Sequence, residues 1–275
     1  MKPLLYLFAA AALFCTTASC KTLRSWDTVT KGGIIYERNA TKPFTGTVRT
    51  YFPGDTQPSE ERPVQNGVTE GIVTTWFENG QKASETMYHN GVKEGKCIKW
   101  HRNGAKKYEA TFVKGKEEGK VTYWYKNGTP RKKLHFHEGV RNGKLEMWYD
   151  SGEKRAVMHF KDGKYDGERK TWFKNGKLSS EGHYVHGSKE GHFVDYFENG
   201  KKSLEATYTK NKLHGKRTVW FKNGNKKHEG NFKNGVPDGY DIIWFVNGQK
   251  QHEAVLKDGN TISVKVWHKD GTRVE

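Results

Sequence analysis

The chain has 275 residues, of which 13% are aromatic, and a formal net charge of +17. Cys97 is the only cysteine beyond residue 20, which excludes a fold held together by intramolecular disulfides. The excess of basic residues favours either an anionic partner or a surface that must stay soluble.

The N-terminus predicts a secretory signal peptide over residues 1–19. Lys2 precedes an apolar stretch over residues 4–14, which is too short to cross a membrane. The sequence Thr-Ala-Ser-Cys at 17–20 resembles a bacterial lipobox, so we expect Cys20 to be acylated and to become the mature N-terminus. The alternative is simple secretion, with cleavage near Ser19.

The rest of the chain divides into a short tether and one long domain. Residues 20–33 are expected to be the lipidated N-terminus and tether, and residues 34–275 a repeat domain with partial units at both ends. Ile34 to Tyr36 predicts a leading strand, and a divergent first unit begins near Phe44.

Eight glycines recur with a spacing of 24 residues: Gly71, Gly95, Gly119, Gly143, Gly167, Gly191, Gly215 and Gly239. Five positions after each glycine comes an aromatic residue, which is tyrosine at Tyr196 and tryptophan at Trp76, Trp100, Trp124, Trp148, Trp172, Trp220 and Trp244. Nine positions after each comes a second glycine, preceded by Asn in seven of the eight units. A fixed period in this range indicates a linear array rather than a globule with one centre.

Each unit predicts a β-hairpin. Asn-Gly between runs of aromatic and β-branched residues favours a two-residue type I′ turn, in which both central residues have positive φ. The second strand ends in another aromatic column, and a loop with a further glycine leads to the next hairpin. We therefore expect an all-β fold: an elongated, single-layer, twisted antiparallel sheet of stacked hairpins. The tryptophans are expected to be structural and to pack against their equivalents in neighbouring units.

The pattern G-x(4)-W-[aromatic]-x-N-G-x-K-x(2)-E-x(2)-Y-x(2)-G, which Gly71 to Gly91 match at every position, resembles the MORN repeat. The resemblance is to the bacterial variant found in proteins labelled YwqK-family antitoxins, and it covers residues 34–271. It is specific as to repeat type, and the family label implies a protein that neutralises a toxin by binding it.

Basic residues cluster just after the Asn-Gly turns, at the strand ends opposite to the acidic residues of the inter-unit loops. They are Lys106, Lys107, Arg131, Lys132, Lys133, Lys154, Arg155, Lys201, Lys202, Lys226 and Lys227. We expect one strongly basic edge that contacts phospholipid headgroups, acidic polysaccharide or lipopolysaccharide phosphate. The alternative is that these residues only keep an exposed sheet soluble. Nucleic acid is not favoured for a secreted, lipid-anchored protein.

No catalytic or metal-binding motif is found. His135, His159 and His183 share one column, but equivalent residues of neighbouring units lie about 9 to 10 Å apart, too far for ligand bonds of about 2 Å to one ion. A glutamate column is expected to pair with neighbouring lysines: Glu85, Glu109, Glu181, Glu205, Glu229 and Glu253. We expect no enzyme activity, no metal and no cofactor.

These observations predict a non-enzymatic, envelope-anchored repeat scaffold that presents an extended basic β-surface to a protein partner or to an anionic envelope polymer or lipid. The expected location is the outer membrane or cell surface. The alternative is an immunity protein that neutralises a toxin by binding it, which requires a toxin met in the periplasm or at the surface.

Overall fold

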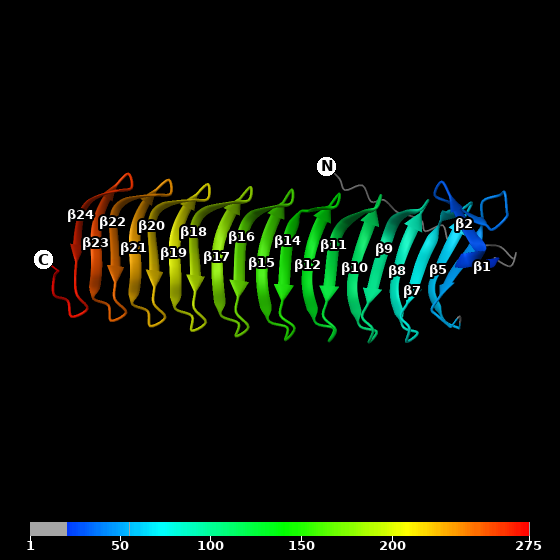
Figure 1. Cartoon of the computed structure of the whole chain (residues 1–275), viewed down its shortest axis with the longest axis horizontal. Coiled ribbons are helices and arrows are strands. Elements are labelled where there is room, and N and C mark those ends of the chain that lie inside the picture. Colours follow the sequence, from blue (N-terminus) through cyan, green and yellow to red (C-terminus); the bar gives the residue numbers. More distant parts are fainter. Residues whose placement is uncertain (1–20, 55, 275) are drawn as a thin grey trace, which may run out of the picture. The chain divides into compact units, whose positions relative to one another are not determined.

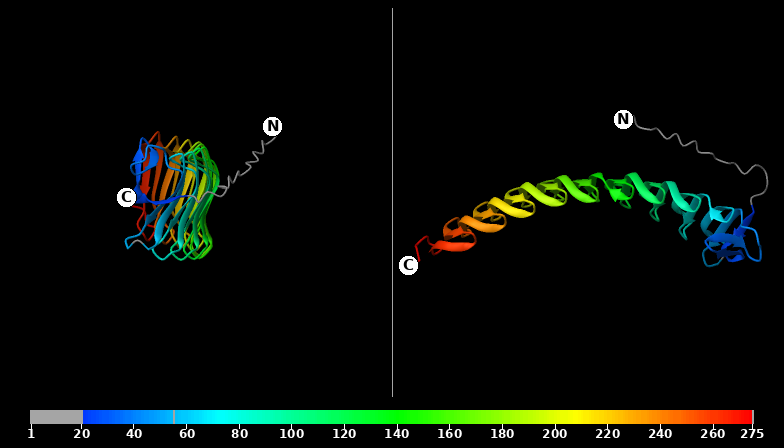
Figure 2. Two further views of the ribbon diagram at one scale, coloured as in Figure 1. Left: turned by 90° about the vertical axis from the view of Figure 1, so that its right-hand side faces the viewer. Right: turned by 90° about the horizontal axis from the view of Figure 1, so that it is seen from above.

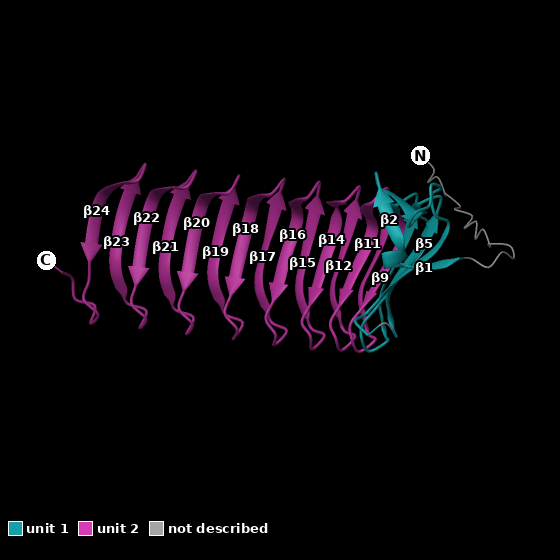
Figure 3. Ribbon diagram, turned by 45° about the vertical axis from the view of Figure 1, so that its right-hand side comes forward, with its two compact units in different colours: residues 1–92 teal, residues 93–275 magenta. Residues whose placement is uncertain are grey.

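The computed structural model describes residues 21–54 and 56–274. The expected signal peptide and Cys20 lie outside these residues. The chain forms two compact units, residues 1–92 and 93–275 (Figure 3). The described part contains one short 3-10 helix, η1 (Ser25–Asp27), and none of its helices is long and apolar enough to cross a membrane.

Unit 1 is a small sheet with a two-stranded hairpin beside it. Its strands are β1 (Thr22–Arg24), β2 (Thr28–Lys31), β3 (Ile34–Glu37), β4 (Gly46–Tyr51), β5 (Pro58–Gln65), β6 (Val68–Thr69), β7 (Gly71–Trp76) and β8 (Lys82–His89). β1 pairs in parallel with β4, β2 pairs with β3, and β4, β5, β7 and β8 are antiparallel neighbours. Leu23 of β1 is buried with Phe44, Val48 and Val64. The segment expected to be a tether, residues 20–33, therefore contains the strands β1 and β2, and its Leu23 packs in this core.

Unit 2 is one antiparallel meander of successive hairpins (Figure 1). Its strands are β9 (Val92–Trp100), β10 (Lys106–Val113), β11 (Lys116–Trp124), β12 (Pro130–His137), β13 (Val140–Arg141), β14 (Gly143–Trp148), β15 (Lys154–Lys161), β16 (Lys164–Trp172), β17 (Leu178–Val185), β18 (Ser188–Tyr196), β19 (Lys202–Thr209), β20 (Lys212–Trp220), β21 (Lys226–Lys233), β22 (Val236–Trp244), β23 (Lys250–Lys257) and β24 (Asn260–Val266). Seen from above, its hairpins follow one another in a single layer (Figure 2). The predicted all-β array of stacked hairpins is confirmed.

The Asn-Gly turns are not the two-residue type I′ turns that the sequence predicts. At the Asn-Gly turns φ is positive only at the glycine, 82° at Gly104. The Gly104 N–H donates to the His101 carbonyl and the His101 N–H to the Ala105 carbonyl, which closes a three-residue loop. The two-residue turns with positive φ at both positions lie at the other strand ends, as at Lys114 (49°) and Gly115 (79°). We call the two sides of unit 2 the Asn-Gly edge and the opposite edge.

The glycines of the 24-residue column lie across the ladder from the aromatic residues that end the second strands. Gly119 pairs with Phe136, and Gly143 pairs with Phe160. Their φ values are 71° and 103°, in the region that favours glycine. On its other side, β11 is out of register with β10 near Gly119. The glycine column therefore marks a bulge in each unit, which raises the local twist.

The two faces of the sheet differ. One, the core face, carries the buried cluster of Cys97, Tyr108, Ala110, Val121, Leu134, Leu145 and Phe160. Cys97 is 1% exposed, in agreement with its reading as a buried apolar residue. The other, the tryptophan face, carries the tryptophan and glutamate columns, because successive residues of a strand point to opposite sides. A single layer buries side chains mainly by covering them with their neighbours on the same face.

Candidate functional surface

Lysines, rather than neighbouring indoles, lie against the tryptophan column. The ammonium of Lys106 lies 5.8 Å from the centre of the Trp124 ring, in the next unit. Lys133 over Trp148, Lys202 over Trp220 and Lys226 over Trp244 repeat the contact at 5.1, 5.9 and 5.4 Å. Among the described residues, cation–π contacts between units therefore take the place of the expected stacking of tryptophan on tryptophan.

Three of these four lysines also pair with the glutamate column. Lys106 Nζ is 2.8 Å from Glu109, Lys202 is 2.9 Å from Glu205, and Lys226 is 2.7 Å from Glu229. A cation from the facing strand often joins the pair, as Lys96 joins Glu109. Hydrogen bonds from Lys106 and then Lys96 hold the pKa of Glu109 below its ordinary value. The predicted Glu–Lys pairing is confirmed at Glu85, Glu109, Glu205, Glu229 and Glu253, and it partly neutralises these lysines. Glu181 instead accepts a hydrogen bond from the Tyr196 hydroxyl.

The structure does not gather the predicted basic residues on one surface. The tryptophan face carries Lys106, Lys133, Lys154, Lys202 and Lys226. Lys132 lies on the core face, where its ammonium is 4.0 Å from the Tyr123 ring centre and burial lowers its pKa. Lys201 lies at the end of a turn. Strand alternation therefore divides the expected edge between two faces and a row of turns.

Four predicted cations lie at bulges near the Asn-Gly edge. Each is the extra residue of its bulge, so it faces no residue in the register with the preceding strand of its hairpin: Lys107, Arg131, Arg155 and Lys227. Arg155 lies 5.8 Å from the Tyr149 ring centre, and Lys227 lies 5.8 Å from that of Phe221. All four side chains are exposed. They are the predicted cations best placed to meet a partner at this edge.

Asparagine side chains join successive turns along the Asn-Gly edge. Asn127 Nδ2 donates to the backbone oxygen of Asp150 at 2.8 Å, and its Oδ1 accepts the N–H of Thr129 at 3.0 Å. Both bonds recur in five further turns, at Asn103, Asn175, Asn199, Asn223 and Asn247. The amide thus closes its own turn and ties it to the next, which fixes the spacing of the turns.

Carboxylates serve the opposite edge in a similar way. The Glu118 carboxylate accepts a hydrogen bond from the backbone N–H of Glu138 at 2.7 Å and another from Nδ1 of the His137 ring at 3.1 Å. Glu94, Asp166 and Glu190 accept the N–H of Lys114, His186 and Lys210 in the same manner. The acidic column therefore caps turns of the following unit. Its sequence signal is an acidic residue immediately before the glycine of the 24-residue column.

The most basic stretch of unit 2 is formed by three successive Asn-Gly turns, at residues 173–177, 197–203 and 221–227. These turns carry the seven lysines that we call the basic turn cluster, Lys174, Lys177, Lys201, Lys202, Lys222, Lys226 and Lys227, and one carboxylate, Glu198. Three of the seven, Lys174, Lys177 and Lys222, were missed in the sequence prediction. Their signal is position, since each lies directly beside an Asn-Gly pair.

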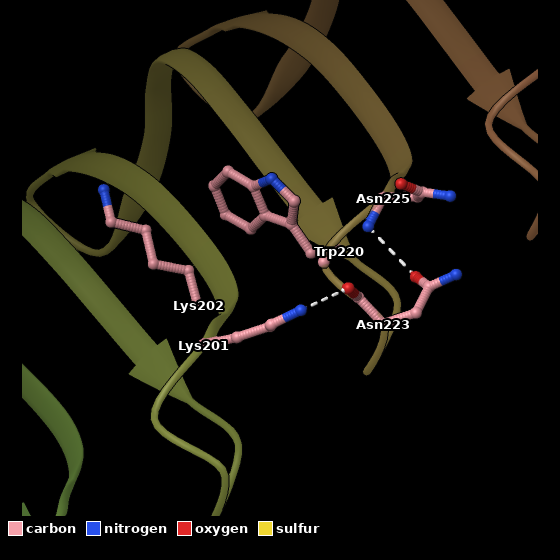
Figure 4. Close-up of a pocket in the computed structure, with 6 residues that line it drawn as sticks. Lys201, Lys202, Trp220, Asn223 and Asn225 are labelled. Atoms are coloured by element: carbon pink, nitrogen blue, oxygen red, sulfur yellow. Dashed lines mark hydrogen bonds between the residues drawn. The ribbon is translucent and has the colours of Figure 1, made fainter.

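A notch opens within the basic turn cluster, between two successive turns (Figure 4). Its volume is about 470 Å³, and it is lined by Lys201, Lys202, Trp220, Asn223, Gly224 and Asn225. Lys201 Nζ donates to the backbone oxygen of Asn223 at 2.5 Å. A second notch, of about 460 Å³, includes Trp124 and Asn127, four periods earlier, but it also includes Asp150.

The histidine column is not brought together as a ligand set. His135 Nδ1 donates to the Lys144 carbonyl at 3.3 Å, and His159 Nδ1 donates to the Glu168 carbonyl at 3.1 Å. Within residues 21–54 and 56–274, no group of three or more His, Cys, Asp or Glu side chains is placed to hold a metal ion. These two histidines bond the backbone of a neighbouring strand.

Five segments of the chain match the model of the MORN repeat variant: residues 69–90, 117–138, 165–186, 189–210 and 213–234. Each spans one Asn-Gly hairpin, from the strand before the turn to the first residue of the following two-residue turn. No curated protein matches the chain. Five of its hairpins are thus similar to the MORN repeat variant, which is typical of repeat-based binding and scaffold proteins.

Proposed function

We propose that this protein is a non-enzymatic repeat scaffold that presents its basic Asn-Gly edge to an anionic partner at the cell envelope. The basic turn cluster is the observation that carries the proposal, because it places seven lysines on three adjacent turns. Three of them, Lys174, Lys202 and Lys226, are paired with the nearby carboxylates of Asp150, Glu205 and Glu229. The side-chain bonds from Asn103, Asn127, Asn175, Asn199, Asn223 and Asn247 to the next turn, which we call the asparagine ladder, hold neighbouring turns at a constant spacing. Such a row of cations gives many modest, salt-sensitive contacts rather than one strong site.

Charge reversal tests the edge. A variant with Lys107, Lys201 and Lys227 changed to Glu should lose most of its salt-sensitive retention on a polyanion matrix. The matched control reverses Lys116, Lys164 and Lys212, which are exposed in strands at the opposite edge. Both variants have the same net charge, so equal losses would assign the binding to overall charge and refute a role for the Asn-Gly edge.

Anchoring at the envelope rests on the sequence at Cys20. Cys20→Ala should move the protein from the membrane fraction to the soluble fraction, and Cys15→Ala should leave it in the membrane fraction. If the Cys20 variant stays in the membrane fraction, the lipobox interpretation is wrong.

The immunity-protein alternative is supported by the resemblance and the five repeat matches alone. Crosslinking in intact cells tests it, with a photoreactive residue placed at Lys222 or, as the control, at Lys212. A toxic protein captured specifically from Lys222 would favour the alternative. Capture of envelope polymer from that position would favour the scaffold.

A further inference from the structure

We propose that the basic turn cluster is a binding site for a linear acidic glycan, with the Trp220 indole as the platform on which a sugar ring stacks. This inference rests on the proposed function and narrows its anionic partner to one chemical class. Three observations support it: the limits of the charged region, the contents of the notch and the spacing of the turns.

The net charge of the Asn-Gly edge falls on both sides of the cluster. In the preceding turn, Asp150 and Glu153 offset Lys154 and Arg155, and the following turn keeps Lys250 but carries Val246 and Gln249 in place of lysines. Three turns separated by two strand spacings each cover about 19 Å. The ligand that fits is therefore a short segment of an extended chain bearing several negative charges.

The notch contains the groups that acidic sugars use. Trp220 supplies an aromatic ring between two turns. The ammonium of Lys202 lies 5.9 Å from the centre of this ring, and Lys201 lies beside it at the turn (Figure 4). An ammonium has three donors, so Lys201 keeps N–H groups for a ligand after its bond to the Asn223 carbonyl. Lys202 is also paired with Glu205, so Lys201 and its neighbours Lys177 and Lys222 supply most of the uncompensated charge.

The repeat spacing suits a periodic polymer. Successive turns are about 9.4 Å apart, comparable to the advance of one disaccharide in an extended glycan. Asn199 and Asn223 fix that spacing, since each bonds the backbone of the next turn at 3.0 Å. A ligand with the same repeat places a charge at each turn without distortion of the protein.

A bilayer surface fits the cluster less well. Interfacial binding uses exposed apolar side chains that enter the boundary between headgroups and acyl chains. The most exposed large apolar residues of unit 2 are Ile262 at 66% and Tyr240 at 58%, and both lie outside the cluster. The cluster presents ammonium groups around a half-buried indole, which favours a soluble or cell-wall polymer.

Binding is measured by calorimetry and tryptophan fluorescence on the full chain, with polygalacturonate, dextran sulfate, neutral dextran and equimolar phosphatidylglycerol–phosphatidylcholine vesicles as probes. Trp220→Ala should weaken polygalacturonate binding about tenfold, the loss expected for one aromatic stacking contact. The matched control, Trp124→Ala, removes the equivalent indole outside the cluster and should leave affinity within about twofold. Lys177, Lys201 and Lys222 changed together to Glu should abolish binding at moderate salt.

Four outcomes overturn the inference. Equal effects of the two tryptophan variants would show that Trp220 is only structural, and circular dichroism of both variants excludes a loss of folding as the cause. Tight binding to vesicles but not to polygalacturonate would assign the cluster to a membrane surface. If the protein binds dextran sulfate with an affinity that Trp220→Ala does not change, the glycan site is refuted and the proposed basic scaffold stands. If the protein binds no polyanion, both proposals are refuted.

Discussion

The side chain of Asn199 donates a hydrogen bond to the backbone oxygen of Lys222, 3.0 Å away and 23 residues further along the chain. Its Oδ1 accepts the N–H of Lys201 at 3.0 Å, within its own turn. One amide therefore connects two repeats and shapes one of them. Because the bond is repeated from turn to turn, the Asn-Gly edge is the most regular candidate surface of unit 2.

Removal of this amide should destabilise the array locally. Asn199→Ala loses both bonds and should lower the free energy of unfolding by about 1 to 2 kcal/mol, since each bond contributes about 1 kcal/mol net. Urea denaturation measures the change, and hydrogen exchange should place it at the turns around residues 199 and 222. Asn199→Asp retains the acceptor within the turn and should lose about half as much. Lys222→Ala keeps the backbone acceptor, so a loss as large as that of Asn199→Ala would contradict the ladder.

The ladder has one substitution in unit 2, at Ser151, where the other units have Asn. Ser151 lacks the amide that would reach the turn containing Lys174. Ser151→Asn should supply it and raise the free energy of unfolding by about 1 kcal/mol. Ser151→Ala, measured under the same conditions, controls for the loss of the hydroxyl. A destabilised Asn variant would mean that the turn at 149–153 differs in geometry from its neighbours.

The pair of Glu118 and His137 should make stability depend on pH in two opposite ways. The N–H of Glu138 and then the His137 ring hold the pKa of Glu118 below its ordinary value of 4.5, so its contribution is lost as pH falls through that lowered pKa. The hydrogen bond to Glu118 raises the pKa of His137 above 6.5, so its contribution is present below 6.5 and lost as pH rises through the raised pKa.

The contribution of the pair should therefore be greatest between about pH 4.5 and 6.5, where both groups are charged. NMR titration of the His137 ring measures the effect directly. Glu118→Gln should lower the pKa of His137 toward its ordinary value, while Glu138→Gln, which keeps the backbone N–H, should change it much less. An unchanged His137 titration in the Glu118 variant would show that the pair does not persist in solution.

Gly182 makes room for the ring of Phe193 on the neighbouring strand. A Cβ added at Gly182 would lie 2.2 Å from two atoms of that ring. Gly182→Ala should therefore cost about 1 to 3 kcal/mol through overpacking. Phe193→Leu should recover part of the loss when combined with it, because the two positions share one space. The measurement is a double-mutant cycle by urea denaturation, and strictly additive effects would refute the contact.

Much of the fold follows from the sequence, because each hairpin is local. The 24-residue period predicts the array, the strand pairs and the columns, and Glu109 does pair with the lysines beside it. These relationships depend on neighbours within one hairpin or on strict repetition, and both are visible in the order of the residues.

The turn type at Asn103 and Gly104 was wrong in the sequence prediction. Asn-Gly fits both a two-residue turn and a three-residue turn with a left-handed glycine. The turn at Ser151 and Gly152, which has no asparagine, closes with the same two backbone bonds, so the turn type does not depend on the asparagine side chain. It goes with the bulged register of the flanking strands, which a residue pair read by itself does not contain.

The candidate surface depended most on tertiary structure. The sequence by itself determined that lysines recur beside the turns, and it placed Lys132 and Lys133 in one basic group. Only the folded sheet decided that Lys133 lies over Trp148 and that Lys132 lies over Tyr123, on opposite faces. The physical reason is that strand alternation and bulges set the direction of each side chain, and the register with the next unit sets which partner it meets.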